Sequence, residues 1–202
     1  MRRGSITIAV AAALVCVSSG VGRVNANNNS NNDGWQELRE ILNNTLGVQG
    51  RNTQRLQTEA FVANLRGRNE VPPISTQGTG RVEMLVVADA GVIAFRLTYA
   101  NLEGGPAPVT PGAAHVHFAP PRVNGGVSFF FCGGTTKPAC PPQPAVVTGA
   151  VTMADIVGPA GQGIAAGEFA EIVAAMRTGF TYANVHTPTF GSGEIRGAVR
   201  RD

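Results

Sequence analysis

Residues 81–100 read RVEMLVVADAGVIAFRLTYA, and this stretch decides the fold. On both sides of the turn at 89–91, apolar residues recur at every second position, which is the spacing of a half-buried β-strand. These apolar residues are Val82, Met84 and Val86 before the turn, and Ile93, Phe95, Leu97 and Tyr99 after it. The stretch therefore predicts an antiparallel β-hairpin.

Short segments with the same character continue on both sides of the hairpin. We predict further strands at 60–66, 113–118, 127–132, 146–153, 180–187 and 194–199. The 26 glycines and 13 prolines of the chain provide turns between such short strands. The sequence thus predicts a mainly all-β fold, an antiparallel Greek-key β-sandwich or barrel, formed by one domain over 59–199.

Two helices are expected beside the strands. Apolar residues at the i, i+3, i+4 and i+7 positions from Phe169, followed by Gly179, predict a helix over 167–178. A short amphipathic helix should begin at Asp33 and end near Gly47. Because a single short helix is marginal alone, we expect this one to dock on the domain.

The first 26 residues have the features of a signal peptide. Arg2 and Arg3 are followed by an apolar run and by an A-x-A-like cleavage site ending at Ala26. Residues 27–58 should form a polar spacer and the short helix, and 200–202 a C-terminal tail. The rest of the sequence has no run long and apolar enough for a transmembrane segment.

The net charge changes once this leader is removed. The leader holds three of the 16 basic residues and no acid, so the remaining 13 basic residues balance the 13 acidic ones. A neutral chain lacks the electrostatic footprint of proteins that bind nucleic acid or anionic membrane surfaces. We therefore expect neither partner.

Cysteine usage agrees with export. Cys16 lies in the leader, so Cys132 and Cys140 are the two thiols of the mature chain. An even pair behind a signal peptide favours one disulfide, worth about 2.5 kcal/mol for a loop this short. Two free thiols, or an intermolecular bond, are the alternatives.

Two positions fit the N-glycosylation pattern, Asn28 in NNS and Asn43 in NNT. This pattern has meaning only in a eukaryotic secretory pathway. We predict a secreted, extracellular protein, which would be periplasmic in a bacterium.

All three histidines fall in two strand-like segments, AAHVHF at 113–118 and YANVHT at 182–187. Side chains alternate along a strand, so His115 and His117 share one face while Val116 turns to the other. If the strand carrying His186 lies nearby, three imidazoles converge as a partial shell for copper or zinc. A hydrogen-bonded polar cluster and acid/base catalysis are the alternatives.

The two last strands should pair, because only TPTFGSG separates them. Pairing Val185 with Ile195 keeps both inside and places His186 opposite Glu194. It also brings three further side chains to the histidine face, Asn184, Arg196 and Tyr182. A carboxylate beside His186 would fix the tautomer of its imidazole.

Several motifs, in this order, resemble the chordin-type domain, written CHRD. They are EVPP at 70–73, AAHVHF at 113–118, the Cys132/Cys140 pair, TGAV at 148–151, NVHT at 184–187 and GEIRGAV at 193–199. The resemblance covers residues 59–199. It implies a secreted or periplasmic β-rich module with an immunoglobulin-like barrel. Chordin antagonises bone morphogenetic proteins, but it carries cysteine-rich domains that this chain lacks, so growth-factor binding is not expected from the resemblance.

The HVH strand is also similar to the copper-binding strand of Cu/Zn superoxide dismutase. This likeness makes a superoxide-dismutase-like barrel the other form of the predicted fold. Three histidines are fewer than the bimetallic set of that enzyme.

Three functional hypotheses follow. The first is a secreted noncatalytic binding module with a polar His/Glu/Arg cluster, whose ligand is an extracellular protein or glycan. The alternative is extracellular copper or zinc binding through His115, His117 and His186. The third is a metal-dependent oxidoreductase.

Overall fold

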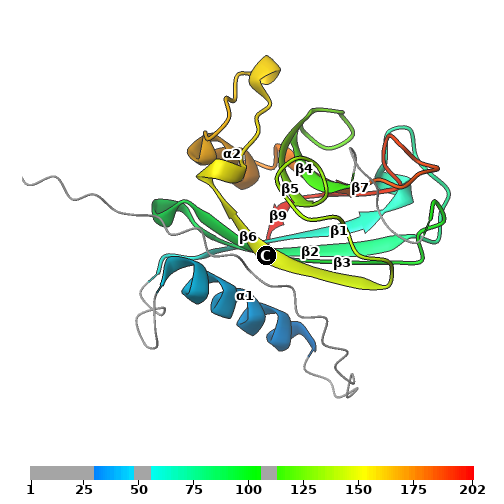
Figure 1. Ribbon diagram of the computed structural model, residues 1–202. Coiled ribbons are helices and arrows are strands. Elements are labelled where there is room, and N and C mark those ends of the chain that lie inside the picture. The colour runs from blue at the N-terminus through cyan, green and yellow to red at the C-terminus, as the bar shows by residue number, and fades with distance from the viewer. Residues whose placement is uncertain (1–29, 48–55, 106–112) are drawn as a thin grey trace, which may run out of the picture.

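A computed structural model describes residues 30–47, 56–105 and 113–202. Within these residues the protein is mostly antiparallel β-sheet, with one nearly closed, barrel-like sheet and two short α-helices (Figure 1). The predicted signal peptide and Asn28 lie outside the described residues. None of the helices in the described ranges has the length and apolar character needed to span a bilayer.

The predicted hairpin is confirmed and forms the centre of the sheet. Strand β2 (Thr79–Val87) pairs with β3 (Val92–Ala100) along its whole length, with Val82 opposite Leu97. The turn is a short 3-10 helix, Ala88–Ala90, closed by Gly91 at a φ of 66°. Glycine suits this left-handed position because it has no Cβ to clash with the backbone.

The other predicted strands are also present. They are β1 (Glu59–Arg66), β4 (Ala114–Phe118), β5 (Gly126–Cys132), β6 (Ala145–Thr152), β7 (Thr181–Val185) and β8 (Ile195–Ala198). Further 3-10 turns span Gly67–Asn69, Met153–Asp155 and Ala160–Gln162. Residues 200–202, predicted as a tail, include β9 (Arg200–Arg201), which pairs with β1 at Phe61 and Val62.

The strand order is β5-β4-β7-β8-β1-β2-β3-β6. The connections from β3 to β4 and from β6 to β7 join strands that are not neighbours, so both cross over as in a Greek key. All the strands belong to one continuous sheet, whereas an immunoglobulin sandwich divides its strands between two. The predicted fold was a Greek-key sandwich or barrel, and the sheet of this chain has the barrel-like form.

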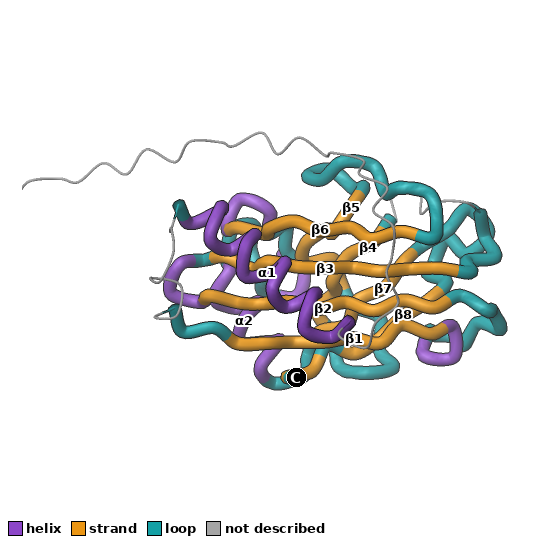
Figure 2. The backbone as a smooth tube through the Cα atoms, turned by 90° about the horizontal axis from the view of Figure 1, so that it is seen from below, coloured by secondary structure: helices purple, strands orange, loops and turns teal. Residues whose placement is uncertain are grey.

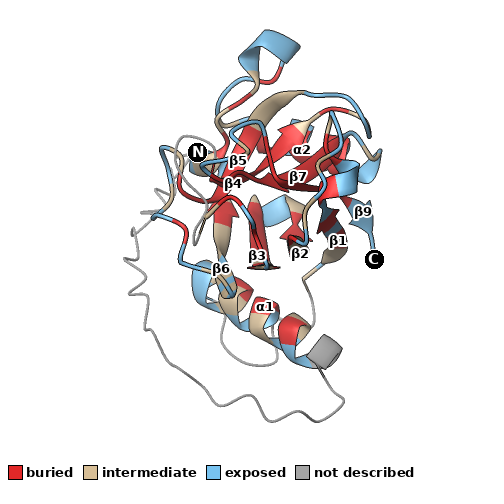
Figure 3. Cartoon of the chain, turned by 90° about the vertical axis from the view of Figure 1, so that its right-hand side faces the viewer, coloured by how far each residue is buried: buried red, intermediate tan, exposed pale blue. Residues whose placement is uncertain are grey.

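The core fills the inside of this barrel. Inward residues of every long strand are buried there, including Phe61, Met84 and Phe129. In Figure 3 much of the ribbon of these strands has the colour of buried residues. The predicted second helix is α2 (Phe169–Arg177), and Ile172 and Met176 join the same core. Figure 1 shows α2 on the side of the sheet opposite α1.

The N-terminal helix docks on the outer face of the sheet, as expected. Helix α1 runs over Ser30–Leu46, so it begins three residues before the predicted start at Asp33. Figure 2 shows α1 lying across β2 and β3. Leu38 and Leu42 are buried against outward residues of these two strands, among them Leu85. This helix explains why β2 is buried on both of its faces.

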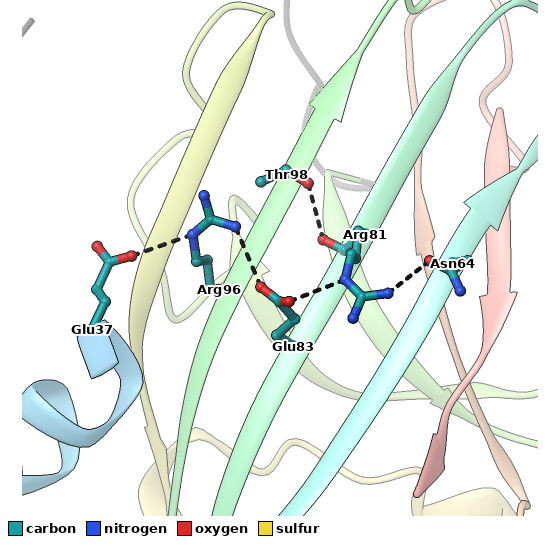
Figure 4. Close-up of polar contacts among 6 residues, drawn as sticks. All are labelled: Glu37, Asn64, Arg81, Glu83, Arg96 and Thr98. Carbon is teal, nitrogen blue, oxygen red and sulfur yellow. Dashed lines mark hydrogen bonds and ion pairs between the residues drawn. The ribbon is translucent and has the colours of Figure 1, made fainter. Parts of the chain in front are cut away.

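A chain of ionic contacts crosses the same outer face (Figure 4). Glu37 of α1 pairs with Arg96 at 3.3 Å, and Arg96 pairs with the buried Glu83 at 3.3 Å. Glu83 also pairs with Arg81 at 3.0 Å, whose guanidinium donates to Asn64. Each charge therefore has an opposite partner, and the contacts tie α1 to three strands.

Cys132 and Cys140 form the predicted disulfide, with their Cα atoms 4.9 Å apart. It closes the loop that follows β5. Asn43 lies in α1 and is half-buried, and its glycosylation stays a prediction.

Candidate functional site

Pairing between β4 and β7 gathers the three histidines. His115 and His117 project from β4, and His186 directly follows β7. The register places His115 opposite Asn184 and His117 opposite Tyr182. The predicted convergence is therefore present, on the outer wall of the barrel.

The imidazoles approach through their Nε2 atoms. Nε2 of His115 lies 2.7 Å from Nε2 of His117 and 3.2 Å from Nε2 of His186. Candidate ligand atoms of the three rings all lie within 4.8 Å of one another. Asn184 adds its Oδ1 atom, 3.1 Å from Nε2 of both His117 and His186.

This outer wall is not open to solvent. His115, His117 and His186 are 2%, 8% and 8% exposed, because loops cover the face that strand alternation turns away from the core. Strand alternation predicted which face the rings share, but it carries no information about the loops above that face.

Two loop carbonyls fix the orientation of two rings. Nδ1 of His117 lies 2.8 Å from the Gly125 carbonyl, and Nδ1 of His186 lies 2.9 Å from the Gly191 carbonyl. A carbonyl oxygen only accepts, so each Nδ1 carries a hydrogen and donates it. In a neutral ring, Nε2 then carries a lone pair.

Burial keeps these two rings neutral. It lowers the pKa of His117 to about 4, with the Gly125 carbonyl opposing the shift. It also lowers the pKa of His186, opposed by the Gly191 carbonyl. Both rings therefore present unprotonated Nε2 atoms at neutral pH, which is the form that ligates metals.

Glu194 does not serve as the carboxylate partner of His186. Its carboxylate is fully buried and accepts hydrogen bonds from two hydroxyls and two backbone amides, those of Thr76, Thr187, Glu103 and Gly104. Strand β8 begins only at Ile195, and Gly193 before it has a φ of 122°. Glu194 therefore lies outside strand β8, and the side-chain alternation from which we predicted its position does not extend to it.

The carboxylate that lies beside the histidine cluster is Glu70, which was expected only as part of the EVPP motif and not as a site residue. Glu70 is 5% exposed, and its Oε1 accepts no hydrogen bond from the described residues. Burial raises its pKa to about 7, opposed by the charge of Arg196 and by the Asn184 amide. The only sequence signal for this role was that Glu70 is an acidic residue at the start of EVPP. That motif does not predict where its loop lies relative to the histidines.

Tyr182 and Arg196 form a stack behind His117. The Tyr182 ring is nearly parallel to the His117 ring, with centroids 4.5 Å apart. The Arg196 guanidinium lies 3.3 Å above the Tyr182 ring and donates to Asn124 at 2.8 Å. Both predicted residues thus support the site without contacting the point where the Nε2 atoms meet.

The site offers nitrogen and oxygen donors, which are groups able to ligate a metal ion. Both described cysteines are joined in the disulfide, so neither is a thiolate ligand. Three imidazole nitrogens and an amide oxygen form a donor set suited to zinc or copper.

The whole β domain corresponds to one known family. The family model described as CHRD domain matches residues 61–199, which is most of the chain and includes every residue of the site. No curated protein matches the chain. The chain therefore belongs to the CHRD domain family.

Proposed function

We propose that this domain is a noncatalytic binding module whose ligand is one transition-metal ion, copper or zinc, held by Nε2 of His115, His117 and His186. The observation that carries the proposal is the meeting of acceptor atoms in a buried space. Lone pairs that face one another repel, so such a cluster needs a proton or a cation between its members.

The protons available in the cluster are too few. Nε2 of His117 and of His186 are acceptors, because each ring donates from Nδ1. The Asn184 Oδ1 is also an acceptor, yet it lies 3.1 Å from both of them. A proton on Nε2 of His115 would satisfy one of these contacts, whereas a metal ion satisfies all of them.

The spacing of the donors fits a small ion. With metal–nitrogen bonds of about 2.0–2.1 Å, adjacent donors of a tetrahedral site lie about 3.3 Å apart. The separations of 3.2 Å and 3.1 Å agree with this value. The 2.7 Å contact between His115 and His117, and a spread of up to 4.8 Å within the histidine cluster, mean that the rings must shift when the ion binds.

Metal analysis of protein purified without an affinity tag tests the proposal. We expect one ion per chain, and loss of that ion in His115→Ala and His186→Ala. Asn64→Ala, which changes an exposed residue on β1 that contacts none of the histidines, should retain the metal. No metal above background, together with no uptake of added zinc or copper by folded protein, would reject metal binding.

The proposal includes secretion into the extracellular space, or into the periplasm of a bacterium. The leader-like first 26 residues support it, as does the disulfide between Cys132 and Cys140. N-terminal sequencing of protein from the culture medium should begin after Ala26. Retention of the full-length chain inside the cell would contradict secretion.

A protein or glycan ligand is the second proposal. It is supported by a hollow of about 560 Å³ on the outer face of the sheet, lined by Arg66, Arg81 and Thr98 among others. Binding of immobilised heparin that is weakened by Arg66→Ala would favour a glycan. If Arg66→Ala binds heparin as strongly as the wild-type protein does, this hollow is not the glycan-binding site.

A further inference from the structure

We infer that Asn184 supplies the fourth donor of the proposed metal site through Oδ1, and that Glu70 and Gly193 position its amide. This inference rests on the proposed function and extends it from a three-histidine site to a closed N₃O site. It concerns an ion that accepts four-coordinate tetrahedral geometry, of which zinc is the main biological example.

The first argument is the place of Asn184 among the donors. It lies on β7 directly opposite His115, and two residues before His186 on the same chain face. Its Oδ1 is equidistant, at 3.1 Å, from Nε2 of His117 and Nε2 of His186. An oxygen in that position lies beside two of the three nitrogens and within reach of an ion held by them.

The second argument concerns which end of the amide faces the cluster. The Nδ2 end of the amide lies on the side of Glu70, since Nδ2 and Oε1 of Glu70 both border position 193. Turning the amide over would direct Oδ1 at Glu70, which is unfavourable when the carboxylate is ionised, because both groups are then acceptors. Glu70 therefore orients Oδ1 toward the histidines, as residues behind a metal ligand commonly do.

The third argument is the absence of a side chain at position 193. A Cβ there would lie 2.5 Å from Oε1 of Glu70 and 2.7 Å from Nδ2 of Asn184. Both separations are below van der Waals contact, and the φ of 122° also disfavours any other residue. Gly193 thus provides the room in which the carboxylate and the amide lie together.

The consequence is a site whose four positions are filled by protein atoms. Asn184 is 3% exposed, as buried as the histidines, and the ring of Phe130 lies edge-on to His115 at 5.3 Å. Catalytic zinc sites keep one position for water, whereas closed sites hold the ion. The geometry points to retention of a metal as the role of this centre.

Cobalt titration tests the inference, because Co²⁺ replaces zinc and its visible absorption depends on coordination. We expect the intense bands of a four-coordinate ion in the wild-type protein. Asn184→Leu should weaken Co²⁺ binding roughly 10- to 100-fold and change the spectrum. Asn184→Asp retains an oxygen donor and should restore affinity, and Asn64→Leu controls for the same substitution outside the site.

A second pair of variants covers the case in which Asn184→Leu does not fold. Glu70→Gln retains an acceptor for the amide and should bind Co²⁺ within a few-fold of wild type, whereas Glu70→Leu should bind roughly 10-fold more weakly. Unchanged affinity and spectrum in folded Asn184→Leu would overturn the role of Asn184, and the same result in Glu70→Leu would overturn the positioning role of Glu70. No Co²⁺ or Zn²⁺ binding by wild type would instead overturn the proposed function.

Discussion

Replacing Glu70 with glutamine should change how the stability of the metal-free protein depends on pH. The folded-state pKa of Glu70, about 7, lies above its ordinary value of 4.5. Between these values the folded state binds more protons than the unfolded state, so stability is lost as the pH rises through this window. Glutamine resembles the protonated carboxyl and has no such loss.

The size of the effect follows from the shift. A difference of about 2.5 pKa units corresponds to about 3 kcal/mol, at 1.36 kcal/mol per unit. Because Glu70 is 5% exposed, solvent screening does not reduce this figure much. The stability of Glu70→Gln relative to wild type should therefore rise by about 3 kcal/mol between pH 4.5 and pH 8.

His117 acts in the opposite direction in both proteins. Its folded-state pKa of about 4 lies below the ordinary 6.5, so the unfolded state binds more protons between these values and stability is lost as the pH falls. In wild type the two effects partly cancel, and the pH profile should be shallow. In Glu70→Gln the acid sensitivity of His117 should become visible.

Urea unfolding of chelator-treated protein at half-unit pH steps measures this difference. Trp35 on α1 is a fluorescent probe of the folded state, with circular dichroism as a second signal. Glu40→Gln, at an exposed position of α1, controls for the substitution itself. Parallel profiles for wild type and Glu70→Gln would refute the reasoning.

Three further outcomes are expected. Leu42→Ala should lower the free energy of unfolding by about 2–5 kcal/mol in denaturant melts, because its side chain is 1% exposed beneath α1; a change below 0.5 kcal/mol would contradict docking of this helix. Glu59→Gln should lower the free energy of unfolding by about 1 kcal/mol at pH 7, since Arg177 lowers the pKa of Glu59 to about 2. This stabilisation is present above pH 4.5 and is lost as the pH falls toward 2. Equal destabilisation by the substitution at pH 7 and at pH 2, measured by denaturant melts, would contradict it. Metal-loaded protein should show no superoxide dismutase activity, because Asn184 fills the fourth position; turnover that scales with metal content would instead support an oxidoreductase.

The fold was predictable because its signals are local. Alternation around 89–91 is sufficient to predict β2 and β3, and the inward placement of Ile195 is sufficient to fix its pairing with Val185. The burial of Leu85 was not predictable from the strand alone. It depends on α1 lying across the outer face of the sheet.

The candidate site was predictable only in part. Alternation placed His115 and His117 together, but their meeting with His186 depends on the pairing of β4 with β7, which are separated by two other strands in the sequence. Glu194 was assigned by extending alternation beyond the end of a strand. Glu70 reaches the site from a loop, and the apolar periodicity that predicts strands and helices does not predict the conformation of a loop.

The crossover between β6 and β7 determines when the three histidines can come together during synthesis and folding of the chain. His115 and His117 come within reach of His186 only after a strand late in the sequence has joined one from the middle. A nascent or translocating polypeptide thus cannot present the complete donor set. If the proposed ion is bound, it is loaded where the barrel closes, from the metal pool of that compartment, and not at the ribosome.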